Sequence, residues 1–544
     1  MSTLAGPAEP RAAKTGGSST FTGLWNSVRL IVRRDRMRFA LWFGLILLAT
    51  LGTVAGIPKA LPDEASRRVF GQLSNTNPAE LLLIGRVFSD SVGGLGAWRV
   101  TAYASVGLGL ASMFAVLRHT RKEEEEGRRE ALGGAVLGRN APLTAAVVVT
   151  LLVNALFGVL LGLGAIGMGL PAAGSVVWGV QLASYGAVMT GVGAVLAQLT
   201  NGSRAASGIG SVVLAVFYLG RGVADSQNSD ALRWASPYGW IENFRPFDSN
   251  NVGPLWPIAL LTGVLVAIGF LLLTRRDENQ GLLPDRPGRA TAVRGLAGPF
   301  SLALRLNRGV LLGWVIGAGA FGLMISGAAQ GATDQISSSP ALQGLIRGGK
   351  PVDAFFSLII DLMAEIFTIY AVAVIARLHT EEGQGLAEPV LATRIGRLRW
   401  AGGFFTVAAA GVAAVLLATG LGMGLGYGAV SGDWALVWPL VGAVLVRLPA
   451  VWVMTGLAAA LYGFWPRLTG PVCYALIGVF MLFGIIVQLL SLDPGAMKIS
   501  PFANVPSLPV AAFDAVPLLW LLLVATVLTL LGVLGLRRRD MHNS

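Results

Sequence analysis

Long apolar stretches without charges alternate along the chain with short charged segments. Each stretch approaches the roughly 20 residues that an α-helix needs to cross a bilayer. The alternating ten-residue segments typical of a membrane β-barrel are absent from the sequence. The pattern therefore predicts an all-α polytopic membrane protein with about 12 transmembrane helices. The expected spans are 39–57, 98–117, 143–170, 176–199, 205–219, 255–273, 310–328, 355–376, 401–427, 434–464, 468–490 and 516–536.

Short elements recur in the same order in the two halves of the chain. Val188-Met189-Thr190-Gly191 returns as Val453-Met454-Thr455-Gly456, and Ser236-Pro237-Tyr238 returns as Ser500-Pro501-Phe502. Their near-constant offset indicates a tandem duplication, and a duplicated membrane domain favours a pathway between its halves. We therefore expect two tandem six-helix repeats, at 38–275 and 309–537. The remaining segments are expected to be a cytoplasmic tail with an amphipathic membrane-surface helix (1–37), a cytoplasmic linker (276–308) and a cytoplasmic tail (538–544).

Charge is scarce and unevenly distributed. Only 13% of the 544 residues are charged, against about 25% in soluble proteins. When the N-terminus is placed inside, most Lys and Arg fall in cytoplasmic segments, as the positive-inside rule requires, so both termini are expected to be cytoplasmic. The net charge of +12 then reflects membrane orientation, and nucleic-acid binding is not expected. With Cys473 alone and scattered histidines, neither an internal disulfide nor a metal site is expected.

The segments expected outside the membrane are rich in proline and aromatic residues. Two of them, 220–253 and 491–514, contain the recurring Ser-Pro-aromatic element. They are interpreted either as short helices or re-entrant turns that cap the pathway, or as ordinary interfacial anchors.

Two cytoplasmic segments at corresponding positions carry similar charge patterns. Charged helix ends at the membrane edge can form ion pairs with a soluble partner, and such pairs set orientation and register. The alternative is a solvated charged turn that only keeps the segment inside. The candidate docking residues are Arg118, Glu125, Glu126, Gly127, Glu130 and Arg139 in the first half, and Glu381, Glu382, Gly383, Glu388 and Arg397 in the second.

Three charges fall within expected spans of the second half. Asp361 and Glu365 are four residues apart and share one helix face, and Arg447 lies in the tenth span. Charge inside a membrane is costly and usually faces a cavity or a partner charge. The three residues are therefore candidates for the substrate pathway or for gating. A structural ion pair, or a position nearer the outer interface, is the alternative.

The sequence contains no complete phosphate-binding loop. Gly344 is followed at the usual spacing by Gly349-Lys350, but Pro351 stands where a magnesium-binding Ser or Thr is required. The chain is therefore not expected to be an enzyme by itself or to bind a cofactor, and ATP and magnesium would belong to a partner.

Six spans, an amphipathic segment before the first, and the Glu-Glu-Gly-x-x-Glu-x-Leu sequence that begins at Glu125 resemble ATP-binding-cassette (ABC) exporter permeases of the type-2 class. The doubled, Ala/Gly/Arg-rich single chain is similar to actinobacterial drug and polyketide-antibiotic (tetronasin-type) exporters. The resemblance covers nearly the whole chain and is most specific in 118–139. The second half departs from the motif, because two extra residues separate Gly383 from Glu388 and Pro389 follows.

The resemblance implies that 118–139 forms a coupling helix seated in a groove of the ATPase subunit. It implies a permease for hydrophobic or amphipathic drugs in the plasma (inner) membrane of an actinobacterium, energised by two copies of a separate ABC ATPase. A proton-coupled secondary multidrug transporter is the alternative, with Asp361 and Glu365 as proton carriers. Against it, the Gly-x-x-x-Asp-Arg-x-Gly-Arg-Arg pattern of the major-facilitator family is missing. A membrane-bound transferase is less favoured, because the outside acids are scattered.

Overall fold

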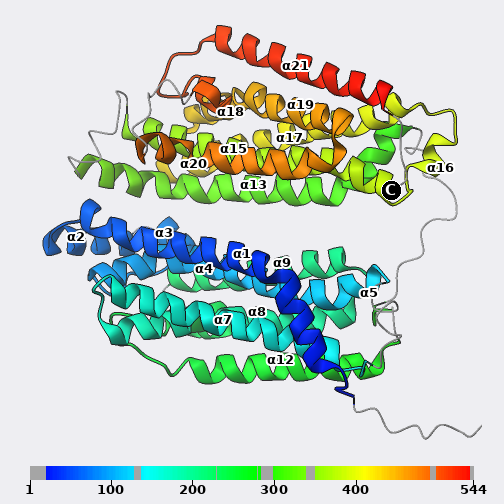
Figure 1. Ribbon diagram of the computed structural model, residues 1–544. Coiled ribbons are helices and arrows are strands. Elements are labelled where there is room, and N and C mark those ends of the chain that lie inside the picture. The colour runs from blue at the N-terminus through cyan, green and yellow to red at the C-terminus, as the bar shows by residue number, and fades with distance from the viewer. Residues whose placement is uncertain are drawn as a thin grey trace, which may run out of the picture. The chain divides into compact units, whose positions relative to one another are not determined.

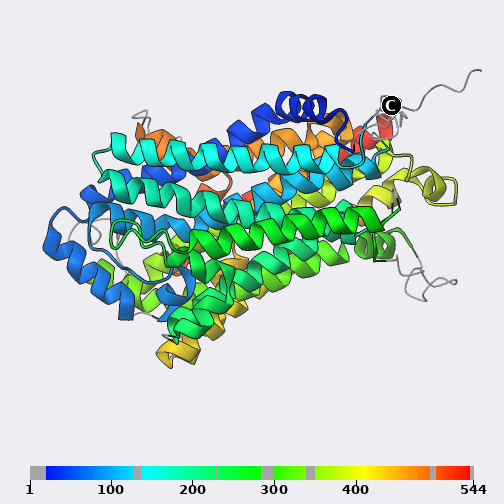
Figure 2. The ribbon, with the colours of Figure 1, turned by 90° about the horizontal axis from the view of Figure 1, so that it is seen from below.

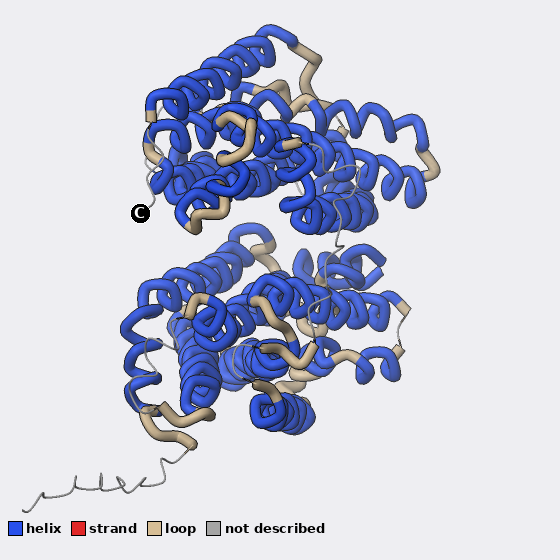
Figure 3. The backbone as a smooth tube through the Cα atoms, turned by 90° about the vertical axis from the view of Figure 1, so that its right-hand side faces the viewer, coloured by secondary structure: helices blue, strands red, loops and turns tan. Residues whose placement is uncertain are grey.

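The computed structural model describes residues 20–76, 78–127, 137–227, 229–277, 280–283, 298–338, 350–489 and 498–539. Within these ranges the chain forms helices joined by loops, with no strand (Figure 3). The expected all-α class is therefore confirmed. The chain divides into two compact units, Met1–Pro287 and Gly288–Ser544, which we call the first and second unit.

The first unit is built from long helices with short helices between them (Figure 1). Its elements are α1 (Leu24–Ala60), α2 (Glu64–Thr76), α3 (Pro78–Leu83), α4 (Val92–Leu117), the π-helical turn η1 (Arg118–Lys122), α5 (Glu123–Glu125), α7 (Ala141–Gly167), α8 (Ala172–Leu199), α9 (Ser203–Ser226), α10 (Asp230–Ala235), α11 (Pro237–Glu242) and α12 (Leu255–Arg275).

The second unit has a similar succession of long and short helices. Its elements are α13 (Pro299–Ser338), α15 (Pro351–Gly383), α16 (Glu388–Leu391), α17 (Arg397–Ser431), η2 (Trp434–Leu436), α18 (Val437–Leu445), α19 (Leu448–Phe464), η3 (Pro466–Leu468), α20 (Thr469–Leu489), η5 (Phe502–Asn504) and α21 (Ala515–Arg538).

Eleven helices in the described part of the chain are long and apolar enough to cross a membrane. They correspond to eleven of the expected spans, and α20 occupies the position of the remaining one without being among the eleven. Large apolar side chains such as Leu41, Leu48 and Leu519 are exposed on their own unit. Extended exposed apolar surface is typical of a membrane or protein contact, and the chain is a multi-pass membrane protein.

The fifth and the tenth expected spans differ from the observed helices in where a helix ends or breaks. The fifth was expected to end at residue 219, but α9 continues to Ser226. The tenth was expected to be one long helix, but it is broken into α18 and α19 at Val446–Arg447. Pro449 explains the break, because proline lacks a backbone N–H donor and disfavours the helical conformation of the residue before it.

The first predicted span is continuous with the amphipathic segment that precedes it. Both belong to α1, and Figure 1 shows this helix bending between its N-terminal section and the rest. The amphipathic stretch is thus an extension of the spanning helix.

The recurring Val-Met-Thr-Gly element lies at a close helix contact in each unit. A Cβ atom on Gly191 of α8 would lie 2.8 Å from the Leu265 side chain on α12, and one on Gly456 of α19 would lie 2.7 Å from the Ala525 carbonyl on α21. Small residues let transmembrane helices approach closely. In both units the glycine therefore allows contact with the last long helix. Figure 2 shows the cyan-to-green helices of the first unit, where α8 contacts both α7 and α12.

Candidate functional site

We call residues 118–139 the first loop and residues 377–397 the second loop. The first begins directly after α4, and the second includes the last turns of α15 and the residues that follow it. In the first loop, Arg118 pairs with Asp35 of α1 at 3.2 Å, and His119 Nε2 lies 2.7 Å from the other carboxylate oxygen of Asp35. Asp35 is only 2% exposed. Arg118 and His119 thus hold the N-terminal part of α1 against the end of α4.

A buried ion cluster follows in the same loop. Glu124 accepts hydrogen bonds from Arg121 at 2.9 Å and from Arg276 at 2.6 Å. Arg276 also donates to the Gln198 side chain at 2.6 Å, and Arg121 donates to the Asn201 carbonyl at 2.7 Å. Sequence reasoning missed this cluster, because its members come from three separate segments.

Two acidic residues of the motif that carries the resemblance have different environments. The Glu125 carboxylate accepts from the Ser203 backbone N–H at 3.1 Å and from the Ser203 hydroxyl at 2.6 Å, so it caps the N-terminus of α9. Glu126 is exposed and lies 3.9 Å from Lys122. Gly127 adopts a φ of 66°, a left-handed conformation that favours glycine at helix ends. Glu130 lies outside the described residues.

Arg139 closes the first loop from its other end. Its guanidinium donates to the carbonyl oxygens of Leu273 at 2.8 Å and of Arg276 at 2.6 Å. Arg139, which lies two residues before the start of α7, therefore binds the C-terminal end of α12.

The second loop places its two glutamates inward. Glu381 pairs with Arg377 at 2.8 Å, and Arg377 also donates to the Leu306 carbonyl at 2.7 Å. Glu382 is 6% exposed and accepts from the Tyr462 hydroxyl at 3.0 Å and from Arg539 at 2.7 Å. The Glu382 side chain consequently contacts its own unit.

The remaining candidates of the second loop lie at its surface or at its far end. Gly383 ends α15 and is exposed, and Glu388 begins the short helix α16 and is exposed. Arg397, the first residue of α17, donates to the Arg539 carbonyl at 3.2 Å. Within the described residues, the exposed members of the candidate set in this loop are thus Gly383, Glu388 and Arg397.

The charges expected inside the membrane are partly paired. Arg447 lies at the break between α18 and α19, is 1% exposed, and forms an ion pair with Asp361 of α15 at 2.6 Å. This is the structural ion pair that the sequence left open as an alternative. Glu365 is half-buried one turn further along α15, and in the described part of the second unit it has neither a hydrogen bond nor an ion pair.

The first unit contains a charge cluster that sequence reasoning placed in an outer loop. Arg221 of α9 is fully buried and pairs with Asp225 at 3.5 Å and with Glu242 at 3.1 Å. Arg233 pairs with the same Asp225 at 3.1 Å. The extension of α9 to Ser226 explains the error, because it carries Arg221 and Asp225 on the same helix. Their spacing of four residues was the available signal.

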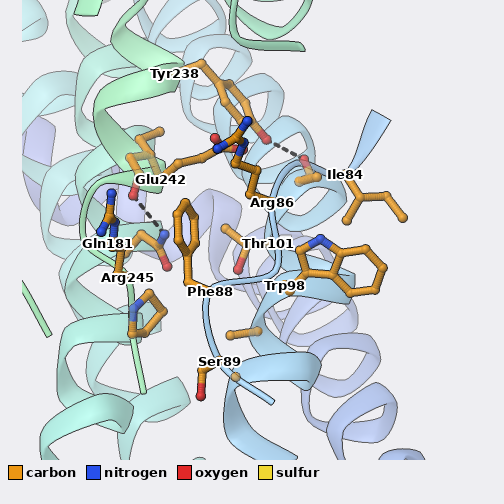
Figure 4. A pocket seen from close by; sticks show the side chains of 15 residues that line it. Ile84, Arg86, Phe88, Ser89, Trp98, Thr101, Gln181, Tyr238, Glu242 and Arg245 are labelled. Carbon is orange, nitrogen blue, oxygen red and sulfur yellow. Dashed lines mark hydrogen bonds between the residues drawn. The ribbon is translucent and has the colours of Figure 1, made fainter. Parts of the chain in front are cut away.

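Glu242 and Tyr238 of α11 line a small cavity beside this cluster (Figure 4). Its volume is about 50 Å³, enough for water but too small for a drug. Gln181, which also lines it, donates to the Ile241 carbonyl at 2.8 Å. Burial raises the pKa of the Glu242 carboxyl well above its ordinary value, while Arg221 lowers it. The cavity thus belongs to a tightly packed end of the unit. The short helices α10 and α11 lie there, within segment 220–253, for which short helices were one of the interpretations.

Larger apolar grooves lie along the long helices. One of about 470 Å³ is lined by α7, α8 and α12, and one of about 370 Å³ is lined by α15, α17, α19 and α21. Both volumes fall in the range of small-molecule sites. Ser184 is the polar side chain in the first groove, and Thr455, Thr526 and Thr529 lie in the second. Each groove has the size and polarity to accept a hydrophobic group.

Residues 296–537 match the family model described as "Multidrug efflux system permease Rv1217c, C-terminal domain". The multidrug efflux system permease protein Rv1217c of Mycobacterium tuberculosis (strain ATCC 25618 / H37Rv) is 35% identical over 547 residues, which covers 98% of each chain. The chain belongs to this multidrug efflux permease family. The family match extends from the segment before α13 to the last turns of α21, so it includes the second loop and the Asp361–Arg447 pair.

Membership of the permease family confirms the coarser part of the resemblance, a membrane permease related to drug efflux. The similarity spans both units, so it also includes the first loop and the charge cluster around Arg221.

Proposed function

We propose that this chain is the transmembrane subunit of an ABC exporter that moves hydrophobic or amphipathic drugs out of the cell. Two copies of a separate ATPase subunit energise it. The observation that carries the proposal is the 35% identity, over nearly the full length, to a permease named as part of a multidrug efflux system. A system has further components, and the type-2 and tetronasin-type resemblance of the sequence supports an ATPase as one of them.

The loops after the second long helices support an ATPase contact. Each loop emerges from a helix end that is anchored by buried ion pairs, and each presents exposed groups beyond that anchor, Glu126 and Gly127 in one and Gly383 and Glu388 in the other. A rigidly held charged tip can set the orientation of a docked partner. In this proposal both loops and both termini are cytoplasmic, and ATP and magnesium bind to the partner.

The internal correspondences support two repeats. Gly191 and Gly456, which belong to the recurring sequence element, both pack against the last long helix of their unit. Transport then proceeds by alternating access, in which the two repeats rock about a pathway at the plasma membrane.

The intramembrane acids support a contact for polar substrate groups. Arg447 compensates the charge of Asp361, whereas Glu365 is left without an ion pair in the described part of its unit. An acid at membrane depth needs a partner charge or water. We assign Glu365 the role of receiving the cationic group of an amphipathic drug.

Coexpression with ABC ATPase subunits of the same organism tests the proposal. We expect one chain to copurify with two ATPase subunits, and drug to stimulate ATP hydrolysis by the complex. Drug uptake into proteoliposomes that contain only this chain, driven by a proton gradient, would instead establish the secondary transporter.

A further inference from the structure

Both units place a buried glutamate of the loop against an arginine that follows the last long helix. In the first unit Arg276, directly after α12, pairs with Glu124 at 2.6 Å. In the second unit Arg539, directly after α21, pairs with Glu382 at 2.7 Å. The glutamate side chains are 2% and 7% exposed. The two contacts therefore have the same location and chemistry, and both glutamates are buried, although the Arg276 side chain is 3% exposed and that of Arg539 is 20% exposed.

The far end of each loop binds the same arginine. Arg139 donates to the Arg276 carbonyl at 2.6 Å, and Arg397 donates to the Arg539 carbonyl at 3.2 Å. The two arginines after the last helices thus contact both the entry and the exit of their loop, the entry through the guanidinium and the exit through the backbone.

The end of the fourth long helix completes the arrangement in each unit. In the first, Gln198 of α8 accepts from Arg276 at 2.6 Å. In the second, Tyr462 of α19 donates to Glu382 at 3.0 Å, and the Arg539 guanidinium lies 5.2 Å from the centre of the Tyr462 ring. In both units the contacts join the loop to the ends of the second, the fourth and the last long helix. The residue types differ only on the fourth helix, which carries Gln198 in one unit and Tyr462 in the other.

We propose that the Glu124–Arg276 and Glu382–Arg539 pairs are mechanical ties, through which movement of each loop is transmitted to the last long helix of its unit. Because this role concerns coupling to an ATPase, it rests on the proposed function. The four residues are positioning residues, since the two glutamates and Arg276 are buried, Arg539 is half-buried, and all act through the loop tip and the helices.

In both units the exposed loop tip, Glu126-Gly127 or Gly383, is close in sequence to the glutamate of the tie. Glu124 lies in α5, two residues before the exposed Glu126, and Glu382 directly precedes Gly383 at the end of α15. Helical backbone precedes the tip in both units, and Arg139 or Arg397 binds the far end of the loop to the end of the last long helix. A displaced tip therefore pulls on the last helix.

The test uses the full chain with its ATPase in proteoliposomes and measures drug molecules moved per ATP hydrolysed. Arg276→Gln and Arg539→Gln remove one guanidinium each. Arg275→Gln and Arg538→Gln are matched controls, because these neighbouring arginines are exposed and have no ion pair in the described part of their units. We expect the tie variants to retain the bound ATPase and its hydrolysis but to transport about tenfold less drug per ATP, a typical size for coupling between sites.

A charge exchange in the second unit separates a tie from general support of the fold. Glu382→Arg combined with Arg539→Glu restores an ion pair and is expected to recover much of the transport per ATP lost in Arg539→Gln. The exchange is made there because Arg121 would repel an arginine at position 124 in the first unit.

Three outcomes decide the matter. Unchanged transport per ATP in both tie variants overturns the ties. Equal losses of ATPase binding, hydrolysis and transport, without recovery on charge exchange, also overturn them, because that is the behaviour of a fold support. An unmodified chain that binds no ATPase overturns the proposed function, and this measurement precedes the others.

Discussion

Charge reversal at Glu126 tests the first loop as a docking surface. Glu126→Lys changes an exposed side chain whose contact with Lys122, at 3.9 Å, is a surface pair. Such helical surface pairs are worth about 0.3–0.5 kcal/mol. Loss of this pair alone should therefore barely change the stability of the membrane subunit.

The same change should strongly affect a docked partner. Like charges brought together across an interface cost several kcal/mol. Since each 1.4 kcal/mol is a tenfold change in affinity, a cost of about 3 kcal/mol lowers ATPase affinity by about 100-fold. The expected loss of ATPase affinity is thus much larger than the expected loss of stability, so the two measurements separate a docking role from a folding role.

Glu125→Lys is a less direct probe, because the structure assigns Glu125 an internal contact. It removes the cap on Ser203 at the start of α9, and loss of such a cap costs about 1 kcal/mol. The Glu125 variant should therefore lower both the thermal stability of the chain and the amount of bound ATPase, whereas Glu126→Lys should lower only the latter.

The assay compares ATPase copurified per permease, drug-stimulated hydrolysis and drug resistance in cells, at matched expression. Glu64→Lys at the start of α2, an exposed glutamate on a segment expected outside, is the control. Normal ATPase binding, hydrolysis and resistance with Glu126→Lys would show that this residue is not part of a docking surface.

Three further results are expected. Asp361→Asn leaves the buried Arg447 uncompensated and should lower the unfolding free energy by about 2 kcal/mol, less than the 3–5 kcal/mol of fully buried pairs because Asp361 is 40% exposed; thermal unfolding in detergent measures it. Glu365→Gln should reduce export of cationic drugs without changing that stability, and equal losses for neutral drugs would contradict the assigned role. The purified chain should hydrolyse no ATP, and Lys350→Ala should leave this background unchanged in a phosphate-release assay.

Hydropathy was sufficient to locate the long helices but failed where buried charges compensate one another. Arg221 and Asp225 resemble the start of an outer loop in sequence, since charge is costly at membrane depth. In the structure they continue α9, because Glu242 and Arg233 from later short helices neutralise them. The end of this helix therefore depends on tertiary partners, which a sequence window cannot include.

The sequence predicted which residues belong to the candidate site better than it predicted which of their side chains face solvent. The motif around Glu125 and Glu126 correctly drew attention to the end of the second long helix. It did not distinguish Glu126, which is exposed, from Glu382, which is buried against Tyr462 and Arg539. Adjacent glutamates in a helical segment point about 100° apart. The phase of each helix end therefore decides whether the second glutamate is exposed, as Glu126 is, or buried, as Glu382 is.

The arginines after the last long helices also show that the sequence does not indicate which of two neighbouring side chains is exposed. The positive-inside rule accounts for basic residues at these positions, but it treats neighbouring ones as equivalent. In the structure Arg275 is exposed and Arg276 is buried, and Arg538 is exposed whereas Arg539 contacts Glu382. The less exposed member of each pair is the residue that directly follows the helix, and its carbonyl accepts from Arg139 or Arg397. One arginine of each pair can thus serve topology while the next connects the loop to the helix, so replacing only the second should reduce transport per ATP without altering orientation.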